Sequence, residues 1–128
     1  MRLLLDTHVA LWAITDSPKL PARARELIAA ATNEIFVSAA SVWEIAIKHG
    51  LGKRLMPISG GEAIAWFTKA GYELLPVTAE HAALTETLPP HHNDPFDRLL
   101  AAQALAEPLR LLTHDPQVAR YSDTTILV

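Results

Sequence analysis

Short apolar runs alternate with amphipathic stretches along the chain, and this alternation predicts the secondary structure. An apolar run between turn-forming residues indicates a buried strand, whereas apolar positions that recur every three or four residues indicate a helix. We predict strands over Leu3–Leu5, Glu34–Val37, Tyr72–Val77, Leu109–Thr113 and Thr125–Val128. We predict helices over His8–Ile14, Pro21–Ala31, Ala39–His49, Glu62–Ala70, Thr78–Thr87 and Pro95–Ala106.

Proline and glycine support several of these boundaries. Pro21 suits the first turn of a helix, Gly50 and Gly52 end the third predicted helix, and Pro89–Asn93 is a polar loop. Strands that alternate with helices need crossover connections, which produce a parallel sheet with helices on both faces. We therefore expect an α/β fold of three layers, α/β/α, with a central, mostly parallel sheet in a single domain, residues 1–128.

The composition agrees with a single domain and excludes some kinds of metal site and cross-link. The chain has 128 residues, of which 50% are hydrophobic, and this is enough for one sizeable core. It has no cysteine, which excludes disulfides and thiolate metal sites and favours a cytoplasmic location. The apolar run at the N-terminus is too short for a signal peptide or a membrane span. The net charge of -3 taken alone argues against a surface that attracts nucleic acid.

Acidic residues stand where the predicted strands end. Ligands of an open parallel sheet bind beyond the carboxyl ends of its strands, where loops and helix starts converge. Asp94 and Asp97 lie at the start of a predicted helix. This helix begins at the carboxyl ends of the strands only if the preceding loop, Leu88–Asn93, runs back to that edge of the sheet. The acidic residues that follow predicted strands are Asp6, Glu44 and Asp115.

Four carboxylates in one cleft would repel one another, and a divalent cation would remove that repulsion. Oxygen ligands without cysteine or a tight histidine cluster suit Mg²⁺ or Mn²⁺ better than Zn²⁺. A cation held in this way can activate water and stabilise the charge that develops during phosphodiester hydrolysis.

Each acidic residue also has an ordinary structural explanation. Ser41 and Glu44 fit a capping box at a helix start, and Asp94 fits a helix cap followed by Pro95. Asp115 could begin a turn before the next proline. Asp6 has no helix to cap unless one begins at the following residues.

Four segments together resemble the PIN-domain family, and within it the VapC-type toxins of bacterial and archaeal toxin–antitoxin pairs. Their order covers nearly the whole chain, and the ordered set is more specific than any one motif. The segments are Leu3-Leu4-Leu5-Asp6-Thr7-His8, Ser38-Ala39-Ala40-Ser41-Val42-Trp43-Glu44-Ile45, Asp94-Pro95-Phe96-Asp97-Arg98-Leu99-Leu100-Ala101-Ala102-Gln103-Ala104 and Leu111-Leu112-Thr113-His114-Asp115.

The resemblance implies a single PIN domain of three layers and an Mg²⁺- or Mn²⁺-dependent endoribonuclease. It implies a cognate antitoxin as partner, and homodimers are common in the family. Asp6 and Asp97 match the first and third acidic positions, the pair most directly tied to metal. Glu44 matches the second position and Asp115 the more variable fourth. Asp94 is not one of the four, and we expect it to be a cap that stiffens the site.

Neighbouring residues are expected to support the carboxylates. Thr7 and Thr113 could hydrogen-bond the carboxylates and fix their orientation, or could be ordinary caps. Arg98 could contact phosphate or balance the acidic cluster, or could be a solvated helix residue. Without the four carboxylates the remaining net charge is -3 + 4 = +1. The basic residues that could then meet an RNA backbone are Lys48, Lys53 and Arg54.

Other functions remain open at this point. A catalytically silent PIN-like module would bind RNA or protein without metal or turnover. A phosphohydrolase with Asp6 as nucleophile lacks its usual second aspartate, because His8 occupies that position. The histidines at positions 8, 91, 92 and 114 have no spacing that specifies a metal-free, two-histidine mechanism, and we expect surface or supporting roles. The aromatic residues Trp12, Trp43, Trp66 and Phe67 are spaced like core or interface residues.

Overall fold

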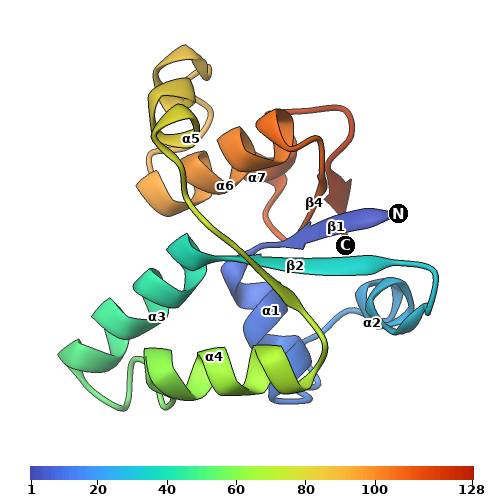
Figure 1. The fold of residues 1–128 in the computed structure, drawn as a ribbon, viewed down its shortest axis with the longest axis vertical. Coiled ribbons are helices and arrows are strands. Elements are labelled where there is room, and N and C mark those ends of the chain that lie inside the picture. Colours follow the sequence, from blue (N-terminus) through green and yellow to red (C-terminus); the bar gives the residue numbers. More distant parts are fainter.

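The computed structural model describes all residues, 1–128, and its centre is a parallel sheet of five strands (Figure 1). The sheet order is β3-β2-β1-β4-β5, and every neighbouring pair is parallel, as expected from the sequence. The strands are β1 (Arg2–Leu5), β2 (Glu34–Ser38), β3 (Glu73–Leu75), β4 (Arg110–Thr113) and β5 (Ile126–Leu127).

Helices cover both faces of this sheet and give the predicted three layers (Figure 1). One face carries α1 (Thr7–Ile14), α2 (Ala22–Ala29), α3 (Ala39–Leu51) and α4 (Gly60–Lys69). The other carries α5 (Ala79–Leu84), the short 3-10 helix η1 (Thr85–Thr87), α6 (Pro95–Ala106) and α7 (Pro116–Ala119). None of these helices combines the length and the apolar composition that crossing a lipid bilayer requires.

The alternation of side chains along β1 divides the core into two halves. Leu3 and Leu5 pack in the cluster that includes residues of α1, α2, α3 and α4, whereas Leu4 packs in the cluster built on α6 and α7. All three leucines are fully buried. A strand that is apolar on both faces is what a central parallel strand requires, because helices cover the sheet on both sides.

The cap of one helix and the presence of another differ from the sequence prediction. Ser38, the last residue of β2, caps α3 by accepting a hydrogen bond from the backbone N–H of Ala40. Ser41 and Glu44 therefore lie inside α3, and the capping-box explanation of this pair is wrong. The short helix α7 was not predicted, because four residues are too few for a periodic pattern.

The connections bring three segments to one edge of the sheet. β1, β2 and β4 are parallel neighbours, so their carboxyl ends lie together. In the sheet, β2 and β3 lie on one side of β1, whereas β4 and β5 lie on its other side. The direction in which strands are added therefore reverses beside β1. The loop 88–94 returns to the same edge, as the sequence argument required, and α6 begins there.

Candidate active site

Asp6 follows β1 directly and lies almost completely buried, with 5% of its surface exposed. Its Oδ1 atom caps α1 by accepting a hydrogen bond from the backbone N–H of Val9 at 2.9 Å. Its Oδ2 atom accepts the expected hydrogen bond from the hydroxyl of Thr113 at 2.5 Å. Burial raises the pKa of the Asp6 carboxyl, although both hydrogen bonds act in the opposite direction.

Glu44 lies in the middle of α3 and is 4% exposed. Its Oε2 atom is 2.7 Å from the Nζ atom of Lys48, one turn further along the same helix. Lys48 is therefore engaged with the site carboxylate, whereas we predicted that it could meet an RNA backbone. The other basic residues of that predicted group, Lys53 and Arg54, are exposed beyond the end of α3.

Asp97 lies in the first turn of α6, where Asp94 is the cap and accepts hydrogen bonds from the backbone N–H groups of Phe96 and Asp97. The pKa of Asp97 is raised to about 7, first by burial and then by the neighbouring carboxylates of Asp94, Asp6 and Glu44. The carboxylates thus interact across three separate elements. The predicted capping role of Asp94 is also present.

Asp115 follows β4 and is the most exposed of the four, with 38% of its side chain accessible. Its Oδ1 atom caps α7 by accepting a hydrogen bond from the backbone N–H of Gln117. Its Oδ2 atom lies 3.0 Å from Nε2 of His92, and the same nitrogen lies 3.2 Å from Oδ2 of Asp97. From the sequence we expected a surface or supporting role for His92 but did not place it between these two carboxylates.

Two supporting residues do not make the contacts that the sequence suggested. The hydroxyl of Thr7 donates to the Oγ atom of Ser41 at 2.9 Å, which joins α1 to α3, and it does not bond a carboxylate. The guanidinium of Arg98 bonds the carbonyl oxygens of Thr85, Leu88 and Pro89. Arg98 therefore anchors the loop before α6 and does not balance the acidic cluster.

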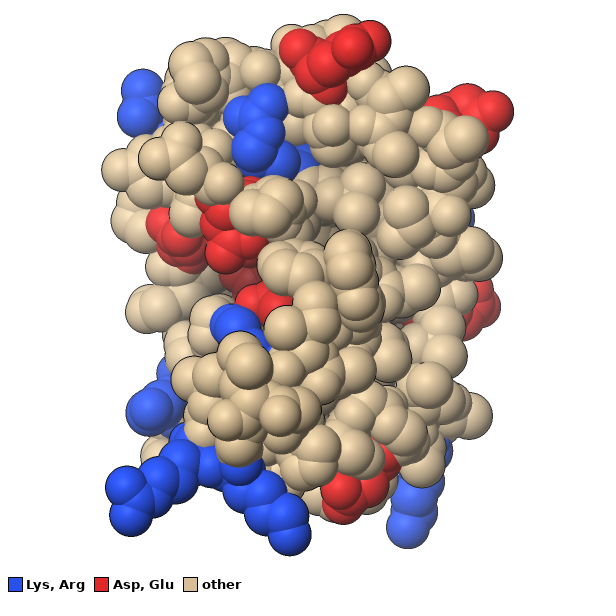
Figure 2. Space-filling view, turned by 90° about the vertical axis from the view of Figure 1, so that its left-hand side faces the viewer, with Lys and Arg blue, Asp and Glu red and all other residues tan.

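The donor set suits a hard divalent cation. The side chains that converge are carboxylates and one histidine, and the pKa of Asp97 is raised first by burial and then by the neighbouring negative charges. The cation that contacts them directly is the single ammonium group of Lys48. Figure 2 shows acidic side chains gathered in a hollow of one face, with basic side chains above and below them. Asp6 and Asp97, with Glu44 and Asp115 beside them, could hold Mg²⁺ or Mn²⁺ there.

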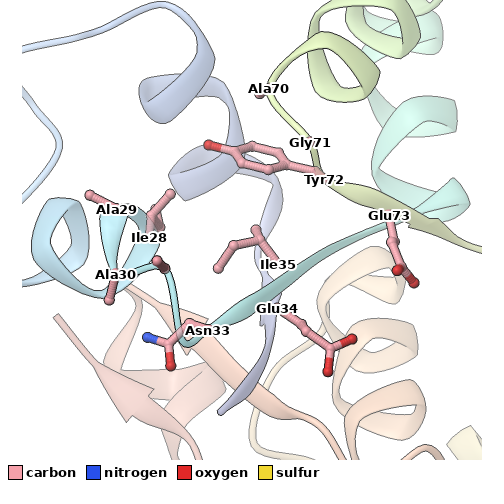
Figure 3. Close-up of a pocket in the computed structure, with 11 residues that line it drawn as sticks. Ile28, Ala29, Ala30, Asn33, Glu34, Ile35, Ala70, Gly71, Tyr72 and Glu73 are labelled. Carbon is pink, nitrogen blue, oxygen red and sulfur yellow. The ribbon is translucent and has the colours of Figure 1, made fainter.

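A cavity at the opposite edge of the sheet does not compete with this site. It measures about 290 Å³ and lies between the end of α2, the start of β2 and the segment before β3 (Figure 3). Its walls are mostly apolar, and burial raises the pKa of Tyr72, whose ring borders it. No group of converging carboxylates or histidines lies there. Charge and geometry thus identify the site, although no enclosed cavity contains it.

Comparison with known proteins gives a family and several related folds. The model of the PIN domain family matches residues 3–123. VapBC2 from Rickettsia felis, solved bound to a DNA fragment from its promoter, aligns with a TM-score of 0.72 at 21% identity, over 100% of this chain and 98% of that one. Among curated proteins, no sequence matches the chain significantly.

Two further solved structures have the same fold. FitAcB from Neisseria gonorrhoeae aligns with a TM-score of 0.64 at 20% identity, covering 98% of this chain and 96% of that one. VapBC-1 from nontypeable Haemophilus influenzae aligns with a TM-score of 0.66 at 15% identity, covering 100% and 97%. At such low identity the alignments establish a shared fold, and activity has to be argued from the residues of the site.

Proposed function

The chain belongs to the PIN domain family, and from this membership we propose that it is a metal-dependent endoribonuclease and the toxin of a toxin–antitoxin pair. One observation supports this chemistry above the others. Asp6, Glu44 and Asp97 come from three elements, yet they lie close enough for the first two to raise the pKa of Asp97. Binding a divalent cation relieves the repulsion of such a cluster, and a cation bound there can promote phosphodiester hydrolysis.

Asp6 and Asp97 are the proposed ligands of Mg²⁺ or Mn²⁺, with Glu44 and Asp115 as the neighbouring carboxylates. When bound, the cation supplies an activated water and neutralises charge that develops on the phosphate in the transition state. The alternative Zn²⁺ is disfavoured because its usual cysteine ligands are missing and its other usual ligand, histidine, contributes one side chain to the cluster.

Hydrogen bonds from neighbouring groups determine which carboxylate oxygens remain available to bind the cation. Thr113 and the N–H group of Val9 engage both oxygens of Asp6 and fix its orientation. Lys48 holds Oε2 of Glu44, while Oε1 accepts no hydrogen bond from the protein. Oδ1 of Asp97 likewise has no protein donor. In the metal-free protein this carboxyl holds a proton below about pH 7, and a bound cation must displace it.

RNA as the substrate follows from the VapC-type resemblance, and the exposed Lys53 and Arg54 supply positive charge for its backbone. An antitoxin partner has a further source of support, because the similar folds are those of VapBC2, VapBC-1 and FitAcB. A cytoplasmic location is part of this proposal, since an RNA nuclease has to reach its substrate.

A homodimer also belongs to the proposal. Trp43, Ile47 and Leu51 stand one helical turn apart on α3 and are 61%, 40% and 75% exposed. An apolar stripe of this kind on a small domain is typical of a contact surface. Phe67, in contrast, is fully buried in the core.

The direct test is cleavage of RNA by the purified chain with Mg²⁺, with Mn²⁺ and with EDTA. We expect cleavage only with the cations, and we expect Asp6→Asn and Asp97→Asn to reduce it to the background without enzyme. Asp123→Asn, at an exposed position outside the site, is the matched control. Circular dichroism checks that each variant folds. Cleavage that persists in EDTA contradicts the metal-dependent mechanism, whereas RNA binding without any cleavage identifies a silent binding module.

The toxin assignment needs a test in cells. Induction of the wild type should arrest growth and produce cleaved RNA, while induction of Asp97→Asn should do neither. Mapping the cleaved ends would identify the class of RNA. Normal growth together with active nuclease in vitro would refute the toxin role and leave the nuclease intact.

A further inference from the structure

His92 contacts two of the four site carboxylates, yet the proposed function gives it no role. It lies in the loop between η1 and α6, and 22% of its side chain is exposed. Its Nε2 atom is 3.0 Å from Oδ2 of Asp115 and 3.2 Å from Oδ2 of Asp97. One nitrogen therefore stands between carboxylates that come from two separate elements, α6 and the start of α7.

The other ring nitrogen determines which atom carries the hydrogen. The backbone N–H of Asp94 donates a hydrogen bond to Nδ1 of His92 at 3.0 Å. A nitrogen that accepts a hydrogen bond carries no hydrogen, so the hydrogen of the neutral ring is on Nε2. Nε2 can then donate to Oδ2 of Asp115 while it lies beside Oδ2 of Asp97, but it has no free lone pair for a cation. The hydrogen bonds thus favour a donor role for His92 over metal ligation.

The loop that carries His92 is fixed from outside the site. The hydroxyl of Tyr121 accepts a hydrogen bond from the backbone N–H of His92 at 2.9 Å and donates to its carbonyl at 3.3 Å. Arg98 donates to the same hydroxyl at 3.1 Å and also bonds the carbonyl of Pro89. Tyr121 and Arg98 together hold the backbone on which the ring is mounted.

We propose that His92 is a positioning residue whose Nε2–H group donates to Asp115, forms a bridge by lying between Asp115 and Asp97, and keeps Asp115 within the site. The side chain of Asp115 is more than one third exposed, and the backbone N–H of Gln117 holds only its Oδ1 atom, so the contact with His92 is the one that directs Oδ2 into the site. Without the bridge, rotation of Asp115 towards solvent would remove the fourth carboxylate from the cluster. The effect on cation binding rests on the proposed function, whereas the bridge itself does not.

Two substitutions of His92 distinguish the role of its Nε2–H donor from the role of the bond between Nδ1 and the Asp94 N–H. His92→Asn keeps an acceptor near the position of Nδ1, and so keeps the bond to the Asp94 N–H, but it loses the donor at Nε2. His92→Gln places an N–H donor near the position of Nε2 and loses the acceptor. His91→Asn, in the same loop, is the matched control, because the side chain of His91 packs against Tyr121 and makes no hydrogen bond to the carboxylates.

The measurement is Mn²⁺ affinity, determined by electron paramagnetic resonance and calorimetry. We expect His92→Asn to weaken Mn²⁺ binding about 10-fold and His92→Gln to stay within about threefold of the wild type, as for groups that orient metal ligands. Equal affinity of His92→Asn and wild type overturns the proposal. The reverse order, in which His92→Gln binds Mn²⁺ weakly and His92→Asn binds it like the wild type, also overturns the proposal. That order would show that only the bond between Nδ1 and the Asp94 N–H matters.

A second measurement needs no metal. Long-range ¹H–¹⁵N spectra of the metal-free protein at pH 8 should show His92 as the neutral tautomer with its hydrogen on Nε2. Finding the hydrogen on Nδ1, or a mixture of tautomers in fast exchange, overturns the proposal. If the wild type binds no Mn²⁺, the proposed function fails, and these spectra still decide whether His92 forms the bridge.

Discussion

Replacing Asp97 with asparagine should stabilise the metal-free protein, and the gain should depend on pH. The pKa of Asp97 is raised from 3.8 to about 7 in the folded state. A raised folded-state pKa favours folding below the unfolded value, and this advantage is lost as the pH rises through the folded value. Wild type therefore loses stability between about pH 4 and pH 7, whereas asparagine does not titrate.

The magnitude follows from the two pKa values. They differ by about 3 units at about 1.4 kcal/mol each. Asp97 therefore costs roughly 4 kcal/mol at pH 8, where the folded protein ionises it, and roughly 2 kcal/mol at pH 5, where the folded protein keeps it protonated. Solvent screening reduces this little, because 21% of the side chain is exposed. The gain from Asp97→Asn should thus grow by roughly 2–3 kcal/mol between pH 5 and pH 8. For a chain of 128 residues this corresponds to about 9 °C in Tm.

The assay is urea unfolding of wild type and Asp97→Asn in EDTA at pH 5 and pH 8. Comparing the gain in the free energy of unfolding at the two pH values removes the effects of the substitution that do not depend on pH, such as a change in side-chain packing. The exposed Asp123→Asn variant is the control and should show no growing gain. A gain that stays constant with pH, or one that the control shares, refutes the reasoning. Mg²⁺ at 100 times its Kd should raise the free energy of unfolding of the wild type by about 2.7 kcal/mol, and it should not raise that of Asp97→Asn.

Three further outcomes are expected. Mn²⁺ affinity, measured by calorimetry, should rise between pH 6 and pH 8, because the proton of Asp97 must leave before the cation binds. Thr113→Val should lower the free energy of unfolding by about 2 kcal/mol in urea, since it removes the donor to Asp6 and the acceptor for the Asp115 N–H. Ile47→Glu, measured by light scattering, should convert a dimer to a monomer, because it buries a charge in the apolar stripe of α3.

The sheet and the positions of the carboxylates were predictable because they follow from chain-wide rules. Apolar runs separated by helices require parallel strands, and parallel strands bring their carboxyl ends to one edge. Asp6 and Asp115 were found by that reasoning alone. Asp97 depended chiefly on the family resemblance and on one condition, that the loop Leu88–Asn93 returns to the same edge. The structure meets this condition, because His92 of the loop contacts both Asp97 and Asp115.

The contacts of single side chains were not predictable in the same way. His92 reaches the carboxylates because Tyr121 and Arg98 hold its loop, and Tyr121 lies 29 residues further along the chain. No local pattern reports such an arrangement. Thr7 was a candidate hydrogen-bond donor to the carboxylates, and Arg98 was a candidate to contact phosphate or balance the acidic cluster, because each follows a site carboxylate in the sequence. Adjacent residues on a helix point in different directions, and both side chains bond elsewhere.

In the sequence, capping and a role in the site are alternative explanations of these carboxylates, whereas in the structure the same residues cap helices and line the candidate site. Asp6 and Asp115 cap α1 and α7, Asp94 caps α6, and Asp97 lies in the first turn of α6. Helices that follow parallel strands begin at the carboxyl edge, so their unpaired N–H groups meet at the position where ligands bind. The partial positive charge of these helix starts favours carboxylates there. It offsets part of their repulsion, which lets the chain hold the cluster in the folded state before any cation binds.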